Sequence, residues 1–352
     1  MNPALSQERI EGLLLGTAVA DAIGLPTEGM TPAKIKKLGW ADSLKHRFFF
    51  GRGMWSDDTE QTIMLAQALL KSEGDCQKFT RAFSWELRWW ILGMPAATGL
   101  ATARAIIKLW LGYPPKCSGV FSAGNGTAMR TSPIAAYFPS DATSRREFCK
   151  AQSQITHSDP KAFFGALAVT ELAALFLNSD TTPSPEEVLQ TIKAITDDPD
   201  WLELVKAIQE SSEAEEEIAD LLPRIGGNPK KGVSGYIYQT FPAVILAGIR
   251  SQWDFQKTIS RLLAAGGDTD TTAAIAGSLC GALHGTSEIP SEWINGIKEW
   301  PTSITKISTL AKAIKNQTPL RIRSRWSPLL ILRNLFFLLV VLFHGFARLI
   351  PR

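Results

Sequence analysis

Cysteine is scarce in this sequence, and the cysteines that occur are far apart. Four are found among 352 residues, at positions 76, 117, 149 and 280, without the spacing of a metal knuckle or a redox pair. They are interpreted as reduced, mostly buried thiols, which suits a reducing compartment. The first ten residues, MNPALSQERI, lack the apolar stretch of a secretory signal. We therefore expect the folded domain to be cytoplasmic.

A strong charge imbalance is also missing. The net charge is +3, and the basic residues are scattered except near the C-terminus, so no nucleic-acid partner is expected. The length is within reach of one large core, and 45% hydrophobic and 20% charged residues are ordinary for a soluble enzyme.

Alternating strand patterns are scarce, and most of the sequence has helical periodicity, so the predicted fold class is all-α. Residues 57–71 place apolar side chains among polar ones and stop near a glycine. Residues 161–178 and 240–250 are rich in Ala and Leu. The acidic tract at 179–222 predicts a solvated peripheral helix and loop.

Two segments carry small residues at every fourth position. One stripe comprises Gly12, Gly16, Ala20 and Gly24, and the other comprises Ala273, Gly277, Gly281 and Gly285. On a helix, such a stripe lets another helix approach closely. Membrane helices use similar stripes, but these apolar runs are too short to span a bilayer and adjoin carboxylates. A tight soluble core is the better interpretation.

The C-terminal region differs from the rest, and we divide the chain into a catalytic domain at 1–315 and a basic linker with a hydrophobic helix at 316–352. Residues 335–343 are all apolar, and arginines lie on both sides of them. We expect residues 329–350 to form a helix that does not join the core and that associates with a membrane, because it is apolar on every face. Arg333 and Asn334 leave open whether it spans or lies on the bilayer. The alternative is a helix packed on the enzyme or in an oligomer interface.

Two short acidic motifs carry the chemistry. They are Ser56-Asp57-Asp58-Thr59 and Asp268-Thr269-Asp270-Thr271, each at the start of a predicted helix. One motif alone could be a helix cap. Four carboxylates held together, however, repel one another unless cations neutralise them. Two Mg²⁺ or Mn²⁺ ions would balance the four charges, and Glu28 could add a fifth. The lack of nearby His or Cys argues against zinc.

A glycine-rich loop follows at 124–130, with the sequence GNGTAMR, preceded by Ser122. Its backbone N–H groups could cradle phosphate, although a structural turn is equally compatible. His157 begins a further helical stretch. It could contact a ligand or serve as a helix cap or a buried packing residue.

Taken in order, these motifs resemble the ADP-ribosylglycohydrolase family. The matching pieces, over roughly residues 8–290, are the segment 16–24 with Glu28, then 56–59, 124–130, His157 with 159–160, 235–236 and 266–271. The two acidic motifs in this order are the specific part. Ala20 departs from the family, which usually has Gly there; it is still small.

The resemblance implies an all-α fold with a binuclear Mg²⁺ or Mn²⁺ centre in a cleft. It assigns the metal ligands to Ser56, Asp57, Asp58, Asp268, Asp270 and Thr271. Glu28 matches a gating glutamate near the metals, and either Glu28 or Asp57 would manage the catalytic proton. The resemblance assigns substrate binding to Gly99, Ser122, Gly124, Asn125, Gly126, Met129 and His157.

The expected function is metal-dependent cleavage of the glycosidic bond between ADP-ribose and an acceptor. The acceptor would be a modified protein side chain or a small ADP-ribosyl conjugate, and the sequence does not choose between arginine and serine linkages. Two alternatives stay open: a two-metal phosphoesterase acting on a nucleotide, and an inactive ADP-ribose-binding protein.

Overall fold

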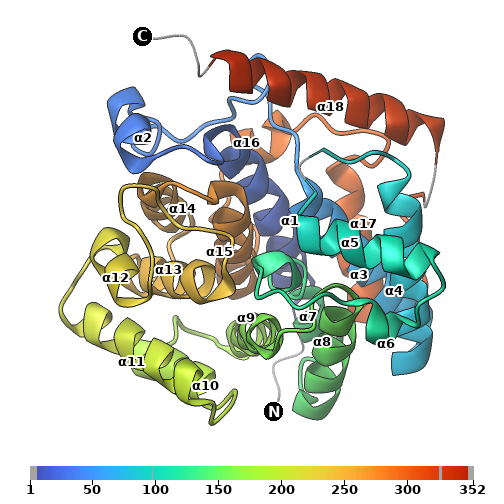
Figure 1. The fold of residues 1–352 in the computed structure, drawn as a ribbon, viewed down its shortest axis with the longest axis horizontal. Coiled ribbons are helices and arrows are strands. Elements are labelled where there is room, and N and C mark those ends of the chain that lie inside the picture. The colour runs from blue at the N-terminus through green and yellow to red at the C-terminus, as the bar shows by residue number, and fades with distance from the viewer. Residues whose placement is uncertain (1–5, 97, 325–326, 348–352) are drawn as a thin grey trace.

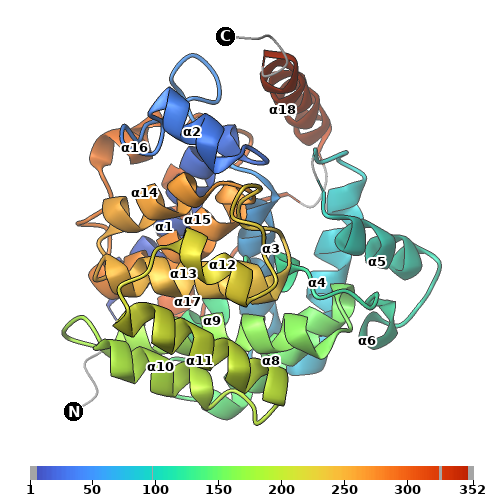
Figure 2. The same cartoon turned by 60° about the vertical axis from the view of Figure 1, so that its left-hand side comes forward.

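The structure is a computed structural model that describes residues 6–96, 98–324 and 327–347. Helices pack around one another in these residues, and strand pairing is limited there to isolated bridges between loops (Figures 1 and 2). An all-α fold class is therefore confirmed. The helices are α1 Gln7–Gly24, η1 Leu25–Thr27, α2 Pro32–Leu38, α3 Asp57–Ser72, α4 Cys76–Ile91, α5 Leu100–Trp110, α6 Pro115–Ser118, η2 Asn125–Thr127, α7 Pro133–Tyr137, α8 Ala142–Thr156, α9 Pro160–Asn178, α10 Pro185–Lys193, α11 Pro199–Glu213, α12 Ile218–Arg224, α13 Ile237–Arg250, α14 Phe255–Ala265, α15 Thr269–His284, α16 Ser291–Gly296, α17 Thr305–Asn316 and α18 Pro328–Ala347.

Helices α1 and α15 pack against each other in the middle of the molecule, and α1 is buried almost all round (Figures 1 and 2). The two small-residue stripes form their interface. A Cβ atom added to Gly16 would overlap the carbonyl oxygen of Gly277, and one added to Gly281 would overlap that of Gly12. The two backbones therefore touch, as the stripes predict. This contact places the C-terminal end of α1 beside the N-terminal end of α15.

The segments expected to be helical at 57–71, 161–178 and 240–250 correspond to α3, α9 and α13. The acidic tract forms α10 and α11 and the start of α12, at the edge of the molecule (Figure 1). Local caps fix several starts. Ser56 accepts a hydrogen bond from the backbone N–H of Asp58, and Asp159 caps α9 ahead of Pro160.

The C-terminal helix corrects an expectation. Residues 328–347 form α18, but this helix packs on the preceding helices and loops through one face, so the prediction that it stays apart from the core is wrong. The buried Arg333 donates to Glu299 Oε2 at 2.9 Å and to the carbonyl oxygen of Trp55 at 2.6 Å. The polar side chains that complicated a membrane span thus find partners inside the protein. Residues 348–350 of the expected helix, and Arg325, Arg348 and Arg352, lie outside the described residues.

Two further contacts attach α18 to the domain. Asn334 Nδ2 donates to the carbonyl oxygen of Gly93 at 2.6 Å, and His344 Nε2 donates to that of Phe48 at 2.7 Å. A small apolar cluster forms beneath the helix and comprises Leu25, Phe48, Met54, Phe337 and Val340.

By length and composition alone, three described helical segments could cross a membrane. They are 7–27, 160–178 and 328–346, and 94%, 67% and 28% of their most apolar windows are buried inside the protein, respectively. The first two belong to the folded core, whereas α18 leaves most of its apolar surface uncovered.

Candidate active site

A cavity of about 360 Å³ opens where the ends of several helices meet. Segments that are far apart in the sequence form its wall: the end of η1, the starts of α3, α5 and α15, and the loops before η2 and α13. The lining residues are Glu28, Asp57, Gly99, Leu100, Ala101, Thr102, Ser122, Gly124, Asn125, Gly126, Met129, His157, Gly235, Asp268, Asp270 and Thr271.

The start of α3 is held in place by Asp21, a carboxylate buried in α1. Asp21 accepts hydrogen bonds from the backbone N–H of Ser56 at 3.0 Å and from the hydroxyl of Thr59 at 2.6 Å. Burial raises the pKa of Asp21 to about 6, against the opposing effect of these hydrogen bonds. Asp21 thus fixes the first acidic motif from behind. We did not predict this role, although a carboxylate within the apolar part of α1 that follows Glu11 was a signal.

The two acidic motifs meet at Asp58. Ser56 Oγ donates to Asp58 Oδ2 at 2.8 Å, and Thr271 Oγ1 reaches the same oxygen at 3.4 Å across 213 residues of sequence. The other oxygen, Asp58 Oδ1, is buried and has no hydrogen-bond partner. An unpartnered buried carboxylate oxygen is costly to stability.

The carboxylates around the cavity raise one another's pKa. Burial is the main cause that lifts the pKa of Asp57, Asp58 and Asp270 well above the usual value. The nearby charges of Glu28 and Asp268 add to the effect at Asp270. The site therefore concentrates negative charge that a cation would relieve.

A glycine lets three loops meet beside the second motif. Gly267 has φ of +85°, and a Cβ atom there would overlap the carbonyl oxygen of Val233. Its N–H donates to Met30 O at 2.9 Å, and the N–H of Asp268 donates to Val233 O at 2.8 Å. These contacts bring the loop after η1 and the loop before α13 to the cavity beside α15.

The glycine-rich loop forms the opposite wall. Asn125 Nδ2 donates to Asp268 Oδ2 at 2.7 Å, which links this loop to the second acidic motif. A Cβ atom on Gly124 or Gly126 would lie 3.1 or 3.2 Å from the ring of His157. These glycines therefore leave room between the loop backbone and the imidazole.

Beneath the loop lies Arg130, a fully buried guanidinium. It donates to Gln61 Oε1 at 2.6 Å and to Thr156 Oγ1 at 2.6 Å. Gln61 in turn donates to Asp57 Oδ2 at 2.9 Å, and Thr156 bonds His157 Nδ1 at 2.9 Å. Burial, with the charge of Arg130, lowers the pKa of His157 to about 3, so its imidazole is neutral. The sequence analysis missed Arg130, because nothing local shows where its side chain points.

Most residues expected to form the site line this one cavity. Ser56 and Asp58 do not; they lie just behind the wall, at the base of the first motif. Four lining residues were not expected as site residues: Leu100, Ala101, Thr102 and Gly235. Among the described residues, no three His, Cys, Asp or Glu side chains form a group that could hold a metal ion as they stand. The roles assigned to these residues stay predictions.

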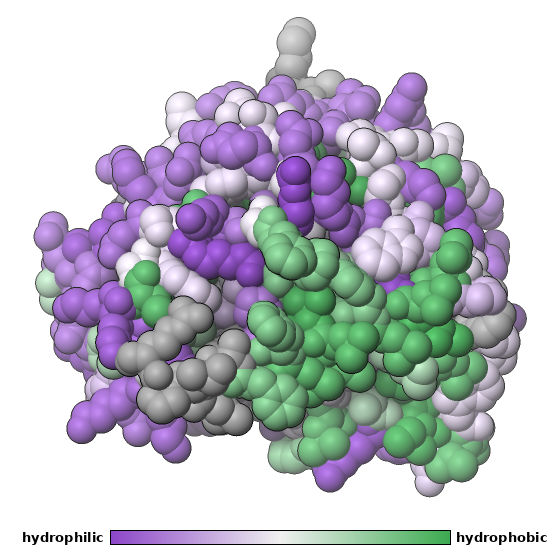
Figure 3. Space-filling view, turned by 90° about the horizontal axis from the view of Figure 1, so that it is seen from above, coloured by the Kyte–Doolittle hydropathy of each residue, from purple (hydrophilic) through white to green (hydrophobic). Residues whose placement is uncertain are grey.

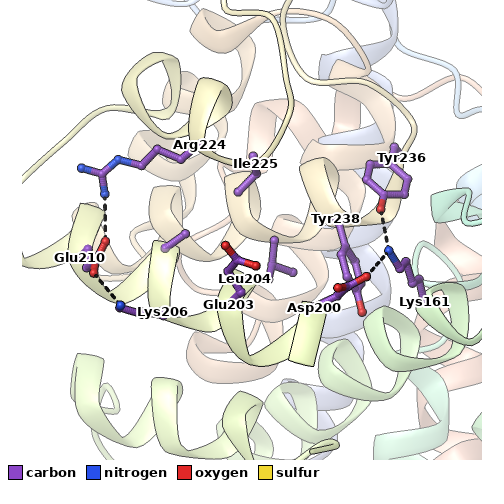
Figure 4. A pocket seen from close by; sticks show the side chains of 11 residues that line it. Lys161, Asp200, Glu203, Leu204, Lys206, Glu210, Arg224, Ile225, Tyr236 and Tyr238 are labelled. Atoms are coloured by element: carbon purple, nitrogen blue, oxygen red, sulfur yellow. Dashed lines mark hydrogen bonds and ion pairs between the residues drawn. The ribbon is translucent and has the colours of Figure 1, made fainter. Parts of the chain in front are cut away.

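A larger hollow, of about 510 Å³, lies between α11 and the start of α13 (Figure 4). Many of its charged side chains pair with one another: Lys161 with Asp200 at 2.7 Å, and Glu210 with Lys206 and Arg224 at 3.7 and 3.5 Å. Paired surface charges offer little to a ligand. The smaller cavity, with its crowded carboxylates, is the better candidate for chemistry.

A sequence profile for ADP-ribosylglycohydrolase matches residues 2–322. The ADP-ribosyl-[dinitrogen reductase] glycohydrolase of Rhodospirillum rubrum is 26% identical over 82% of this chain and 90% of its own. The ADP-ribosylarginine hydrolase of Pseudomonas putida is 24% identical over 88% and 79%. A solved structure titled ADP-ribosylglycohydrolase-related protein complex matches with a TM-score of 0.65 and 25% identity, over 89% of this chain and 98% of that one.

The chain belongs to the ADP-ribosylglycohydrolase family. Its members are hydrolases, and the two relatives are named as a hydrolase of ADP-ribosylarginine and a glycohydrolase of ADP-ribosyl-[dinitrogen reductase]. The matched region ends at residue 322, so α18 lies beyond it.

Proposed function

We propose that this protein is a metal-dependent hydrolase that cleaves the glycosidic bond between ADP-ribose and an acceptor. The acceptor would be a modified protein side chain or a small ADP-ribosyl conjugate. One observation carries the proposal: carboxylates from three separate segments share a cavity with a glycine-rich loop. Membership of the family supports the reaction class, and the carboxylates suit a reaction with an oxocarbenium-like transition state.

The metal ligands we propose are the six residues of the two acidic motifs named above, for two Mg²⁺ or Mn²⁺ ions. The donors fit hard cations, because all are carboxylate or hydroxyl oxygens. The unpartnered Asp58 Oδ1 and the raised pKa of Asp57 and Asp270 support this fit. The side chains would have to close in on the ions. When bound, such ions would acidify a water molecule and orient the ribose hydroxyls.

The glycine-rich loop would hold the diphosphate and ribose of ADP-ribose. Gly124 and Gly126 keep the backbone open next to His157, so backbone N–H groups can approach a phosphate closely. His157 is neutral at physiological pH and would contact the ligand by hydrogen bonding rather than by charge. Gly99, Ser122 and the neighbouring wall would complete the enclosure.

Proton transfer is proposed for the carboxylates at the open side of the cavity. Glu28 and Asp57 both line the cavity and keep part of their surface exposed, so substrate can reach them. Gln61 fixes the Asp57 carboxylate by a 2.9 Å hydrogen bond. A positioned carboxyl within reach of the leaving acceptor can supply or remove its proton.

The test is incubation with Mg²⁺ or Mn²⁺ and either arginine-linked or serine-linked ADP-ribose, with free ADP-ribose measured. Release of ADP-ribose and an unmodified acceptor is expected. Asp268→Asn should abolish it, whereas Asp254→Asn, at a distant helix cap, should not. AMP or phosphate as product would instead identify a phosphoesterase. ADP-ribose binding without turnover of either substrate would identify an inactive binding protein.

A further inference from the structure

The uncovered side of α18 forms a continuous apolar surface. Seen from above, it is the broad hydrophobic patch in Figure 3. We define the apolar face as the exposed residues of α18 together with Phe49 and Phe50, which reach it through the contact of Phe49 with Phe336, at 5.0 Å between ring centroids. The α18 members are Leu329, Leu332, Leu335, Leu338, Leu339, Leu342, Phe343 and Phe346, between 38% and 71% exposed. Soluble proteins rarely leave so large an apolar patch uncovered.

Two exposed cations adjoin the apolar face. The arginines of the C-terminal segment do not supply this charge where the structure describes them, because Arg333 is buried against Glu299 and Arg321 pairs with Glu86. Exposed Arg52 pairs through its backbone with Phe49, and exposed Lys298 bonds the adjoining Gly53, so both cations lie at the edge of the face. This edge would repel a second copy in a two-fold contact, where each patch meets itself. It would be attracted to anionic lipid head groups.

The contacts on the buried side of α18 determine whether the helix can span a bilayer or lie flat on it. Twenty residues are long enough to span the hydrocarbon core. A spanning helix, however, would have to pull Arg333 and Asn334 away from Glu299, Trp55 and Gly93 and expose them to lipid. A helix that lies flat keeps all these contacts and buries only the apolar face.

We propose that the apolar face lies flat on an anionic lipid bilayer and attaches the catalytic domain to the membrane surface without crossing it. The exposed leucines and phenylalanines would enter the boundary between head groups and acyl chains. Arg52 and Lys298 would then lie at the level of the head groups. This attachment does not depend on the chemistry in the cavity.

The first test is flotation of the purified full chain with vesicles of phosphatidylcholine, with and without phosphatidylserine. Binding is expected to be stronger with phosphatidylserine and to weaken as salt is raised. Leu339→Glu together with Phe343→Glu should reduce binding at least about tenfold, since each loses burial of a large side chain. Hydrolysis of a soluble substrate should be unchanged, because neither residue lines the cavity.

The matched control is Ile107→Glu with Leu111→Glu, two exposed aliphatic positions away from α18. This variant should bind vesicles like the wild type. Equal loss in both variants, or equal binding to vesicles without phosphatidylserine, would overturn the proposal. So would a stable dimer that does not float, because it would identify a second copy as the partner.

A cross-link separates flat attachment from spanning. Cysteines at Phe49 and Phe336, with Cys76 and Cys117 replaced by Ser, should react with a short bifunctional maleimide both in solution and on vesicles. A helix that leaves the domain to cross the bilayer would lose the cross-link on vesicles. That result would overturn flat attachment even if flotation succeeds.

Discussion

Asp270 shows the cost of gathering acidic side chains in one place. It is buried, and its pKa is raised first by burial and then by the charges of Glu28 and Asp268. Groups of this kind are held for function at the expense of stability. The unpartnered oxygen of Asp58 belongs to the same cluster. Functional and structural effects of a substitution here should therefore have opposite signs.

Asp270→Asn should abolish ADP-ribose release while stabilising the protein in the absence of divalent cations. The gain is expected to be on the order of 1 kcal/mol, because one source of repulsion disappears. Chemical denaturation in the presence of a chelator measures this change in the free energy of unfolding, with Asp254→Asn as the control. A variant that keeps wild-type turnover would contradict the assignment of Asp270 to the active centre.

His157 should leave a signature in the acid stability of the protein. Its folded pKa is lowered to about 3, from 6.5, by burial and by Arg130. Between pH 6.5 and about 3, the unfolded chain binds a proton at His157 and the native state does not. The free energy of unfolding therefore falls as pH is lowered through this window. His157→Gln should make the fall between pH 6.5 and 3 shallower than in the wild type, as measured by denaturation at several pH values. An unchanged slope would show that the native imidazole takes up the proton.

At the scale of helices, the interface between α1 and α15 is a backbone contact rather than an interdigitation of side chains. Glycines form the contact, and carbonyl oxygens of the facing helix occupy the space where a Cβ atom would otherwise lie. This closeness is what brings Asp21 and Glu28 within electrostatic reach of Asp270. A small change in the distance between α1 and α15 would therefore alter the distances between the carboxylates of the site.

Gly281→Ala should be strongly destabilising for this reason. The new methyl group would overlap Gly12 O, and relief requires the helices to move apart, at a cost of about 1–3 kcal/mol. Gly99→Ala is the control, since its Cβ would meet nothing within 4 Å. Thermal melts should separate the two variants; similar melting temperatures would mean that the helices are not in backbone contact.

Helix α18 adds a second constraint through a buried ion pair. Burial raises the pKa of Glu299 to about 8, while the charge of Arg333, 2.9 Å away, acts in the opposite direction. The two hydrogen bonds between these side chains also act to lower the pKa of Glu299, and they favour the charged pair. The ionised form of Glu299 is therefore stabilised by Arg333.

Arg333→Met should therefore cost about 3–5 kcal/mol, because it strands a buried carboxylate. Adding Glu299→Gln should recover part of the loss, since the stranded charge is then removed. Denaturant unfolding of the two variants gives the comparison. If adding Glu299→Gln lowers the stability below that of Arg333→Met alone, the ion pair between Arg333 and Glu299 does not attach α18 to the protein.

At the scale of the whole molecule, cation and ligand binding should stabilise one cooperative unit. ADP-ribose with Mg²⁺ should raise the melting temperature. At a hundredfold excess of ligand over Kd, the free energy of unfolding should increase by about 2.7 kcal/mol. Gly126→Val should remove the rise, because its side chain would crowd His157 and Thr102. Calorimetry with and without ADP-ribose checks both. A full shift in Gly126→Val would place the ligand elsewhere.

The sequence predicted what lies in local patterns, and the fold decided the rest. The acidic motifs, the glycine-rich loop and the small-residue stripes are contiguous or periodic, so their type and spacing could be interpreted directly. Asp21 and Arg130 act through partners that are remote in sequence, and no local pattern identifies those partners. The same holds for α18: its hydrophobicity was plain, but the acceptors for Arg333 and Asn334 were not.

The meeting of Asp58 with Thr271, 213 residues later, has a consequence for synthesis. At about 5–20 residues per second, roughly 10 to 40 seconds separate the emergence of the two. During that interval α1 is present without α15, the helix that covers its glycine stripe. The nascent chain therefore carries an apolar helix that lacks its packing partner, and such a helix suits chaperone binding. The cavity with its two acidic motifs cannot form until most of the protein has left the ribosome.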